Sequence, residues 1–344
     1  MITLKDIARR AGTSVAIVSK VLNGSRTTAA VRADVRERVL NVAKKLGYQP
    51  NLLARGLAKG KTYTIGIVFT YPPLAFMGNF MVSQVISGIW DKARRAGYNI
   101  FLKAPKSNKS GFFPQVDDLK GRVDGIVALG PVRCDDEEVV KWNNADIPLV
   151  LLGRHPKFSG YSIDYDNEGG AYLATKYLLR QGHGDIAFVG AGLENSFMED
   201  RLRGYKKAIA EKKLPLKEEL IKITSWRGND GYKAAKELMS LPQPPTAIFI
   251  CIGEHIRGVF EAVKESGLRV PDDVELLSFD RLPEDLLINI PLLSLNTFPY
   301  KLGQLGTRIL LNLIDGKDVE ERTIKVPIRC VVEVGKRRKG GEGP

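Results

Sequence analysis

The first sixty or so residues concentrate the positive charge of this chain. Residues 1–62 contain thirteen lysines and arginines and three acidic residues, a net charge of +10, whereas the whole 344-residue chain carries +13. A charge excess confined to a short terminal segment is the electrostatic signature of a polyanion-binding module. Charge alone does not separate DNA from RNA, from an anionic membrane or from a solvated basic surface.

The spacing of apolar residues predicts that three helices carry these charges, at 4–11, 15–22 and 31–46. Thr3 and Asp6 have the spacing of a capping box, and Ser14 is placed to cap the second helix. Gly12, Asn23-Gly24 and Gly47 are expected to end the three helices. The inward faces are formed by Leu4, Ile7, Ala8, Ala11, Val18, Val21, Leu22, Val35, Val39, Val42 and Leu46. Two short helices joined by a tight turn predict a helix-turn-helix.

This arrangement assigns a role to the start of the second helix. When Val18 and its neighbours face the core, Val15, Ala16, Ser19 and Lys20 project outward, where a helix-turn-helix enters the major groove of DNA. Lys20 can donate to O6 or N7 of guanine, whereas Val15 and Ala16 can offer apolar contact to a thymine methyl group. The alternative is that Lys20 is an ordinary solvated lysine.

Catalysis and metal binding find little support in the sequence. The three histidines, His155, His183 and His255, lack metal-ligand spacing, and the chain has neither a Gly-x-Ser-x-Gly elbow nor a P-loop. Gly-His-Gly-Asp at 182–185 falls between a predicted helix and strand, at the wrong end of a sheet for chemistry. We therefore predict no catalytic residue, no metal and no cofactor.

The remaining composition suggests a location for the protein. The three cysteines, Cys134, Cys251 and Cys330, are odd in number and widely spaced, which is typical of reduced thiols. No segment approaches the roughly twenty apolar residues of a membrane helix, and the N-terminus lacks the apolar run of a secretory signal. These features predict a cytoplasmic protein without a membrane partner.

Short β-rich segments alternate with helical stretches through the rest of the chain. Strands are predicted at 64–69, 98–103, 125–129, 149–152, 185–189, 221–224, 247–251 and 275–279, and a helix at 82–96. This alternation is typical of doubly wound parallel sheets in an α/β fold. The strands are too many for one sheet, so we expect two lobes with a ligand site between them, at the carboxyl ends of the strands.

Motifs along the chain resemble the LacI family of bacterial transcriptional regulators. In the head they are Thr3-Leu4-Lys5-Asp6-Ile7-Ala8, Ala11-Gly12-Thr13-Ser14, Val18-Ser19-Lys20-Val21-Leu22-Asn23 and Leu46-Gly47-Tyr48-Gln49-Pro50-Asn51. In the body they include Gly182–Gly190, Arg201-Leu202-Arg203-Gly204-Tyr205, Ser278-Phe279-Asp280 and Leu292-Leu293-Ser294-Leu295-Asn296, the last resembling a late crossover strand. The resemblance implies a body of the periplasmic-binding-protein fold. The loop 24–31 is longer than is usual in the family.

The resemblance also implies a hinge helix at 51–58 that orders on DNA. In the family a leucine of this helix wedges into the minor groove, and the matching residue is Leu57, flanked by Arg55 and Lys59. Taken alone, Leu57 fits a packing residue better than a wedge, but its Ala-Arg-x-Leu context and its charged neighbours reverse that preference. The predicted DNA-contacting set is Thr3, Ser14, Val15, Ala16, Ser19, Lys20, Asn23, Tyr48, Asn51, Arg55, Leu57 and Ala58.

Effector-contacting residues follow from the same resemblance. Arg201 matches the main polar ligand contact, Asp280 the hydroxyl acceptor and Trp226 an aromatic that stacks on the effector. The other members of the predicted set are Phe80, Met81, Asn195, Phe197 and Ile252. The alternatives are that Trp226 belongs to the core and that Arg201 and Asp280 form an internal ion pair.

One departure from the family concerns the effector. Where the family has Asn-Asp after the strand ending near Cys251, this chain has Ile252-Gly253. The asparagine contacts ligand in many members, so its replacement predicts an effector that is less sugar-like than usual.

These observations predict a regulator, most simply a repressor, that binds a pseudo-palindromic operator as a homodimer and responds to a small, sugar-like effector. The expected domains are a helix-turn-helix at 1–50, a hinge at 51–62, a two-lobed body at 63–335 and a basic tail at 336–344. The tail lacks apolar heptads, which argues against a tetramer built on a coiled coil. A solute-binding protein or an enzyme of the same α/β class is the alternative, and neither would bind a palindromic duplex.

Overall fold

The computed structural model describes residues 2–22, 31–48, 60–70, 79–103, 116–130, 132–134, 138–225, 228–282 and 290–334. The chain divides into two compact units, Met1–Thr62 and Tyr63–Pro344. Within the described ranges, no helix is both long enough and apolar enough to cross a membrane.

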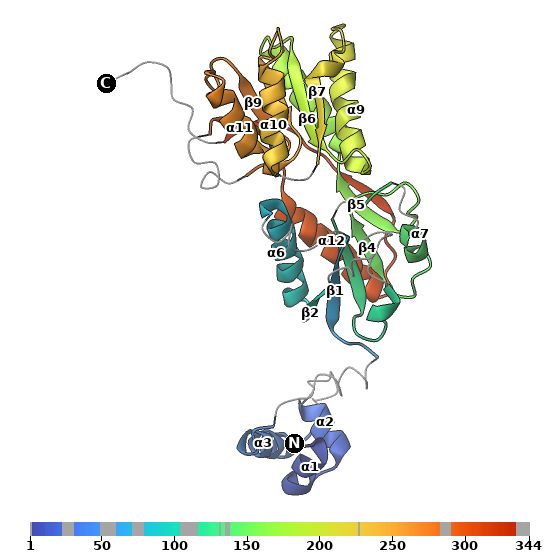
Figure 1. Cartoon of the computed structure of the whole chain (residues 1–344). Helices are drawn as coiled ribbons and strands as arrows, with labels where there is room; N and C mark the ends of the chain where they lie inside the picture. Colours follow the sequence, from blue (N-terminus) through green and yellow to red (C-terminus); the bar gives the residue numbers. More distant parts are fainter. Residues whose placement is uncertain are drawn as a thin grey trace, which may run out of the picture. The chain divides into compact units, whose positions relative to one another are not determined.

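In its described residues the first unit contains three short helices, α1 (Leu4–Ala11), α2 (Val15–Leu22) and α3 (Ala33–Lys45) (Figure 1). Ile7, Val18 and Val39, one from each helix, are fully buried in a shared apolar cluster. The three predicted helices are thus present, with α3 slightly shorter than expected. Leu46 rather than Gly47 is the C-cap of α3, and Gly47 follows it with a φ of 59°.

The second unit contains two six-stranded sheets, one in each lobe. The first sheet is wholly parallel, in the order β11 (Thr323–Val326), β5 (Tyr161–Tyr165), β4 (Leu149–Leu152), β3 (Gly125–Leu129), β1 (Thr64–Phe69), β2 (Asn99–Lys103). The second has the order β12 (Val331–Val334), β10 (Leu292–Leu295), β9 (Glu275–Ser278), β8 (Ala247–Ile250), β6 (Ile186–Ala191), β7 (Ile221–Thr224), with β12 antiparallel.

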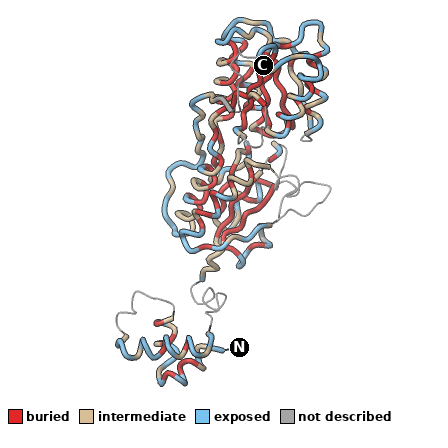
Figure 2. The backbone as a smooth tube through the Cα atoms, turned by 90° about the vertical axis from the view of Figure 1, so that its left-hand side faces the viewer, coloured by how far each residue is buried: buried red, intermediate tan, exposed pale blue. Residues whose placement is uncertain are grey.

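Apolar clusters cover both faces of each sheet, as a doubly wound fold requires. Along β8, Phe249 packs into one cluster while Ile248 and Ile250 pack into the cluster on the opposite face. Figure 2 shows buried residues running along the strands of both lobes. The covering helices are α6 (Phe80–Arg95), α7 (Glu138–Trp142), α8 (Asn167–Arg180), α9 (Ser196–Glu211), α10 (Gly228–Met239), α11 (Ile256–Glu265) and α12 (Pro299–Ile314), with 3₁₀ turns η2 (Val116–Leu119), η3 (Glu218–Leu220) and η4 (Gly253–His255).

The chain passes between the lobes three times. It leaves the first lobe after β5, returns after β10 to form α12 and β11, and crosses again to form β12 (Figure 1). α12 packs beside α6, and two glycines permit the close approach. A Cβ at Gly88 would lie 2.0 Å from the carbonyl oxygen of Tyr300, and one at Gly303 would lie 2.1 Å from that of Val85.

The predicted α/β architecture is confirmed, with β1, β3, β4 and β7 at the predicted residues and several other elements shifted by one or two residues. Three of the described strands, β5, β11 and β12, were not predicted from the sequence. β11 is an edge strand that alternates exposed and half-buried residues, and β5 contains polar Ser162 and Asp164. Neither pattern resembles the continuous apolar runs of the central strands.

Candidate functional site

The first candidate site is the outer face of the helical head. Thr3 and Asp6 form the predicted capping box, in which the Thr3 amide donates to Asp6 Oδ2 at 3.0 Å, and Gly12 ends α1 in the left-handed conformation. Ser14 Oγ accepts the Ile17 amide at 3.3 Å and so caps α2. Both caps lie where the sequence placed them, and they fix the turn between α1 and α2.

α2 buries one side and exposes the other. Val18 and Val21 are buried, whereas Val15 is 39% exposed, Ala16 and Lys20 are exposed and Ser19 is half-buried. Tyr48 is half-buried against the core of the head. The predicted contact residues Asn23, Asn51, Arg55, Leu57 and Ala58 lie outside the described residues.

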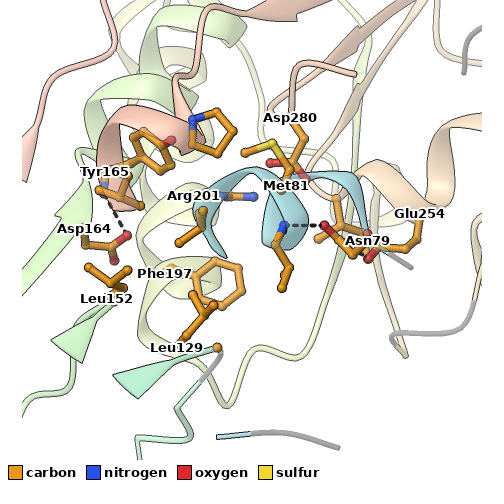
Figure 3. A pocket seen from close by; sticks show the side chains of 17 residues that line it. Asn79, Met81, Leu129, Leu152, Asp164, Tyr165, Phe197, Arg201, Glu254 and Asp280 are labelled. Carbon is orange, nitrogen blue, oxygen red and sulfur yellow. Dashed lines mark hydrogen bonds between the residues drawn. The ribbon is translucent and has the colours of Figure 1, made fainter. Parts of the chain in front are cut away.

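The second candidate site is a cavity of about 220 Å³ between the two lobes of the body (Figure 3). It lies at the carboxyl ends of the strands, where ligand sites of doubly wound sheets are found. Its walls are mainly apolar, and four charged side chains enter it. The lining residues are Asn79, Met81, Val82, Val85, Leu129, Gly130, Leu152, Gly153, Asp164, Tyr165, Phe197, Arg201, Ile252, Glu254, Asp280, Pro299 and Leu302.

Arg201 extends from α9 into the middle of the cavity (Figure 3) and is only 6% exposed. Its Nε donates to Asn167 Oδ1 at 3.0 Å and its Nη1 donates to the carbonyl of Cys251. The guanidinium also lies 3.4 Å from the ring centroid of Phe279, a cation–π contact. Burial lowers the pKa of Arg201, although nearby Asp280 opposes that shift. The side chain is thus a fixed cation, because the guanidinium stays protonated in proteins.

Asp280 follows β9 and is 8% exposed. Its Oδ2 accepts the backbone amide of Gly253 at 2.9 Å, and its backbone carbonyl accepts the hydroxyls of Ser278 and Ser294. Burial raises the pKa of Asp280, opposed by Arg201 and by the Gly253 amide. In the described structure, Asp280 and Arg201 form hydrogen bonds with other groups and not with each other. This arrangement differs from an internal ion pair, the alternative role for these two residues.

Asp164 and Tyr165 end β5 on the opposite wall. Asp164 Oδ1 accepts the Tyr165 amide at 2.7 Å (Figure 3), and burial raises the pKa of Asp164 to about 6. The phenol of Tyr165 is buried, and its hydroxyl has no hydrogen-bond partner in the described structure. Burial raises the pKa of Tyr165, and the carboxylates of Asp280 and Asp164 raise it further. Sequence reasoning missed both residues because it did not predict β5.

Glu254 and Asn79 connect the lobes at the mouth of the cavity. Asn79 Nδ2 donates to Glu254 Oε1, while Asn79 Oδ1 caps α6 by accepting the Val82 amide at 3.0 Å (Figure 3). Glu254 is exposed as a residue, yet desolvation of its carboxylate raises its pKa, and nearby Asp280 raises it further. Neither residue was in the predicted site.

The other residues predicted to contact the effector do not all line this cavity. Met81, Phe197 and Ile252 line the cavity together with Arg201 and Asp280. Phe80 lines a neighbouring cavity with Arg281 and Phe298. Asn195 is the buried N-cap of α9, and its Nδ2 donates to the Gly192 carbonyl at 3.0 Å. Trp226 lies outside the described residues. Within the described ranges, no three His, Cys, Asp or Glu side chains are grouped so as to hold a metal ion.

Comparisons with known proteins give the family of the chain. Residues 3–51 match the family model of bacterial regulatory proteins of the lacI family, and residues 175–333 match a periplasmic binding protein-like domain. Catabolite control protein A of Priestia megaterium is 30% identical over 331 residues, which cover 95% of this chain and 97% of that protein. The transcriptional repressor PurR of Mannheimia succiniciproducens is 30% identical over 335 residues, covering 96% and 98%.

A similar fold is found among solved structures. The lac repressor dimer bound to operator and an anti-inducer superimposes with a TM-score of 0.83 at 26% identity, covering 97% of each chain. A complex of the regulator CelR with cellobiose shares the fold, with a TM-score of 0.70 at 24% identity, covering 97% of this chain and 99% of that one.

Proposed function

The chain belongs to the LacI family of DNA-binding transcriptional repressors, and we propose that a small hydroxylated effector, bound in the cavity between its lobes, controls its affinity for operator DNA. Its relatives are transcription regulators, so the chain is a regulator and not an enzyme. The observation that carries the proposal is Arg201, a buried cation held in place at the centre of a mainly apolar cavity.

The head supports the DNA-binding part of the proposal. Lys20, Val15 and Ala16 are exposed together on α2, and their side chains can contact base edges in a major groove. The net charge of +10 on residues 1–62 supplies phosphate contacts. We assign residues 1–50 to DNA binding, 51–62 to a hinge, 63–335 to effector binding and 336–344 to a basic tail.

The chemistry of the cavity supports a small hydroxylated effector. Asp280 and Asp164 can accept hydroxyl hydrogens, and Arg201 and Tyr165 can donate hydrogen bonds. The apolar walls, including Phe197 and Leu302, fit the carbon skeleton of the ligand. Ile252 adds an apolar surface where an asparagine is usual in the family, so fewer hydroxyl contacts are available on that side.

Polar contacts join the two lobes, and a bound effector can alter these contacts. Arg154 Nη2 lies 2.9 Å from each carboxylate oxygen of Asp200, and Asn79 bonds Glu254 at the cavity mouth. A ligand held by both lobes stabilises the lobe arrangement to which it binds best, and thereby shifts the population of DNA-binding states.

We further infer that the chain acts as a homodimer. α6 exposes Trp90, which is 54% accessible, and the adjacent edge strand β2 exposes Phe101 and Leu102 at 37% and 44%. Large exposed side chains on neighbouring elements are typical of a protein interface. A two-fold dimer would present two recognition helices to the half-sites of a pseudo-palindrome.

The proposal can be tested with the full-length protein. Selection from a random duplex pool is expected to yield a pseudo-palindrome, whose affinity is then measured by fluorescence anisotropy with and without candidate effectors. Arg201→Ala is expected to bind the selected duplex but to lose the effector response. Affinity for the selected duplex no higher than for a scrambled one would refute operator binding. An unchanged effector response in Arg201→Ala would refute the cavity as the effector site.

A further inference from the structure

The charged side chains that line the cavity indicate which charge its ligand carries. This inference rests on the proposed function, since it concerns the effector of the same site. Among the described residues of the lining, one cation, Arg201, is present with three carboxylates, those of Asp164, Asp280 and Glu254. This described part of the lining therefore carries a formal charge of −2 when all four groups are ionised. A negatively charged ligand would add to this excess.

The carboxylates are incompletely neutralised by the protein. In the described structure Arg201 donates hydrogen bonds to Asn167 and to the Cys251 carbonyl, not to a carboxylate. Asp280 accepts a neutral backbone amide from Gly253, and Glu254 accepts a neutral side-chain amide from Asn79. Asp280 and Glu254 lie near enough to each other for the charge of Asp280 to disfavour ionisation of Glu254. Two neighbouring carboxylates bonded to amides leave room for a cation.

The opposite wall offers a hydrogen-bond donor that has no acceptor. Tyr165 is 9% exposed and lines the cavity, and its hydroxyl proton has no acceptor in the described structure, while the Phe298 backbone amide lies near the phenol oxygen as a donor. A buried hydroxyl without a partner is destabilising, so a ligand oxygen that accepts its proton would bind favourably. This observation is independent of the acidic groups and points to a ligand bearing a hydroxyl or ether oxygen.

We propose that the effector is a hydroxylated amine, such as an amino sugar or an amino polyol, whose ammonium group lies between Asp280 and Glu254 while an oxygen accepts from Tyr165. The same charges disfavour compounds that bear carboxylate or phosphate groups. Ile252-Gly253, which stands where Asn-Asp is usual, adds no carboxylate to the cavity, and the Gly253 amide is a neutral donor to Asp280 Oδ2 at 2.9 Å.

The test uses full-length protein and compounds matched in skeleton but not in charge. Aldohexoses, the corresponding 2-amino-2-deoxyhexoses, the hexuronic acids and the hexose 6-phosphates are compared by their effect on Tm. The amino sugars are expected to raise Tm most, and Glu254→Gln is expected to weaken their binding about tenfold. Glu261→Gln removes an exposed carboxylate from α11, outside the cavity, and is the matched control. A neutral or anionic member that raises Tm more than its amine counterpart overturns the proposal.

If none of the compounds binds, the Tm of the ligand-free variants tests the proposal instead. If the carboxylates are in excess, Glu254→Gln and Asp164→Asn each raise the Tm of the ligand-free protein, while Glu261→Gln does not. An unchanged or lower Tm in both cavity variants overturns the proposal. Measurements of operator binding show whether this inference fails alone or together with the proposed function. If the protein binds its selected duplex and only neutral or anionic compounds alter that binding, the charge assignment alone fails.

Discussion

Replacing Asp164 by asparagine removes one charge from the cavity and preserves an oxygen that can accept the Tyr165 amide. The pKa of Asp164 is raised from 3.8 to about 6, so its ionised form destabilises the folded protein at neutral pH. A shift of about two units corresponds to at most about 3 kcal/mol. Water in the cavity screens part of this effect because Asp164 is partly exposed, so we expect Asp164→Asn to add about 1–3 kcal/mol at pH 8.

The pH dependence has a definite sign. The folded state holds a proton on Asp164 at pH values where the unfolded state has lost it, so stability rises as pH falls from about 7 toward 4. Burial is the main cause of the raised pKa of Asp164; the Tyr165 amide, Arg201 and Asn167 lower this pKa, and Asp200 raises it. Asparagine does not titrate, so the variant is expected to lose this part of the slope and to converge with the parent protein at about pH 4.

Thermal unfolding followed by circular dichroism between pH 4 and pH 8 measures both effects. For a unit of this size a gain of about 1–3 kcal/mol corresponds to an increase in Tm of roughly 2–6 °C at pH 8. Glu261→Gln controls for the loss of one negative charge. If Asp164→Asn unfolds at the same or a lower temperature at pH 8, with the slope of the parent protein retained, the carboxylate is compensated in the folded state and the reasoning is wrong.

Four further substitutions test other parts of the molecule. Lys20→Ala is expected to reduce operator affinity by about 1–3 kcal/mol and to relax base preference at one position of each half-site, and an unchanged selection profile would exclude Lys20 from base contact. Asp280→Ala is expected to abolish the effector response in the anisotropy assay while operator binding persists, and a fully responsive variant would remove Asp280 from the site. Trp90→Glu is expected to convert the dimer to monomer in sedimentation velocity, and an unaffected dimer would place the interface elsewhere. Gly88→Ala places a methyl group against the Tyr300 carbonyl oxygen and is expected to lower stability by about 3 kcal/mol in denaturant unfolding, whereas a neutral effect would show that α6 and α12 separate easily.

The parts of the fold that were predictable are those in which one local pattern determines the structure. Gly125–Leu129 and Leu149–Leu152 are buried on both faces, so their apolar runs identify central parallel strands. The helices of the head were also predictable from local patterns. Thr3 and Ser14 each accept a backbone amide from a residue three positions later, which marks the start of a helix. β12 was not predictable, because β10, its partner among the described strands, lies far away in the sequence and pairs with it antiparallel.

The candidate site shows the limit of local patterns more clearly. Arg201 and Asp280 could be proposed because each lies in a recognisable motif, whereas Asp164 becomes a cavity residue only when Tyr161–Tyr165 is a strand with its carboxyl end at the cleft. Glu254 depends on contact with Asn79, which comes from the other lobe. A single sequence contains these side chains but does not show which loops meet.

The replacement at Ile252-Gly253 illustrates how the structure changes an interpretation. From the sequence, the missing asparagine meant one fewer hydroxyl contact and hence a less sugar-like effector. In the structure, the same segment gives Asp280 a backbone donor at 2.9 Å and brings Glu254 to the cavity mouth, near Asp280. Neither Ile252 nor Gly253 is acidic, so the negative charge on this side of the cavity comes from Asp280 and Glu254 themselves, and a carboxylate attracts cations as well as hydroxyl hydrogens. A difference in charge selects between amines and acids of the same size, which the loss of a single hydrogen bond would not do.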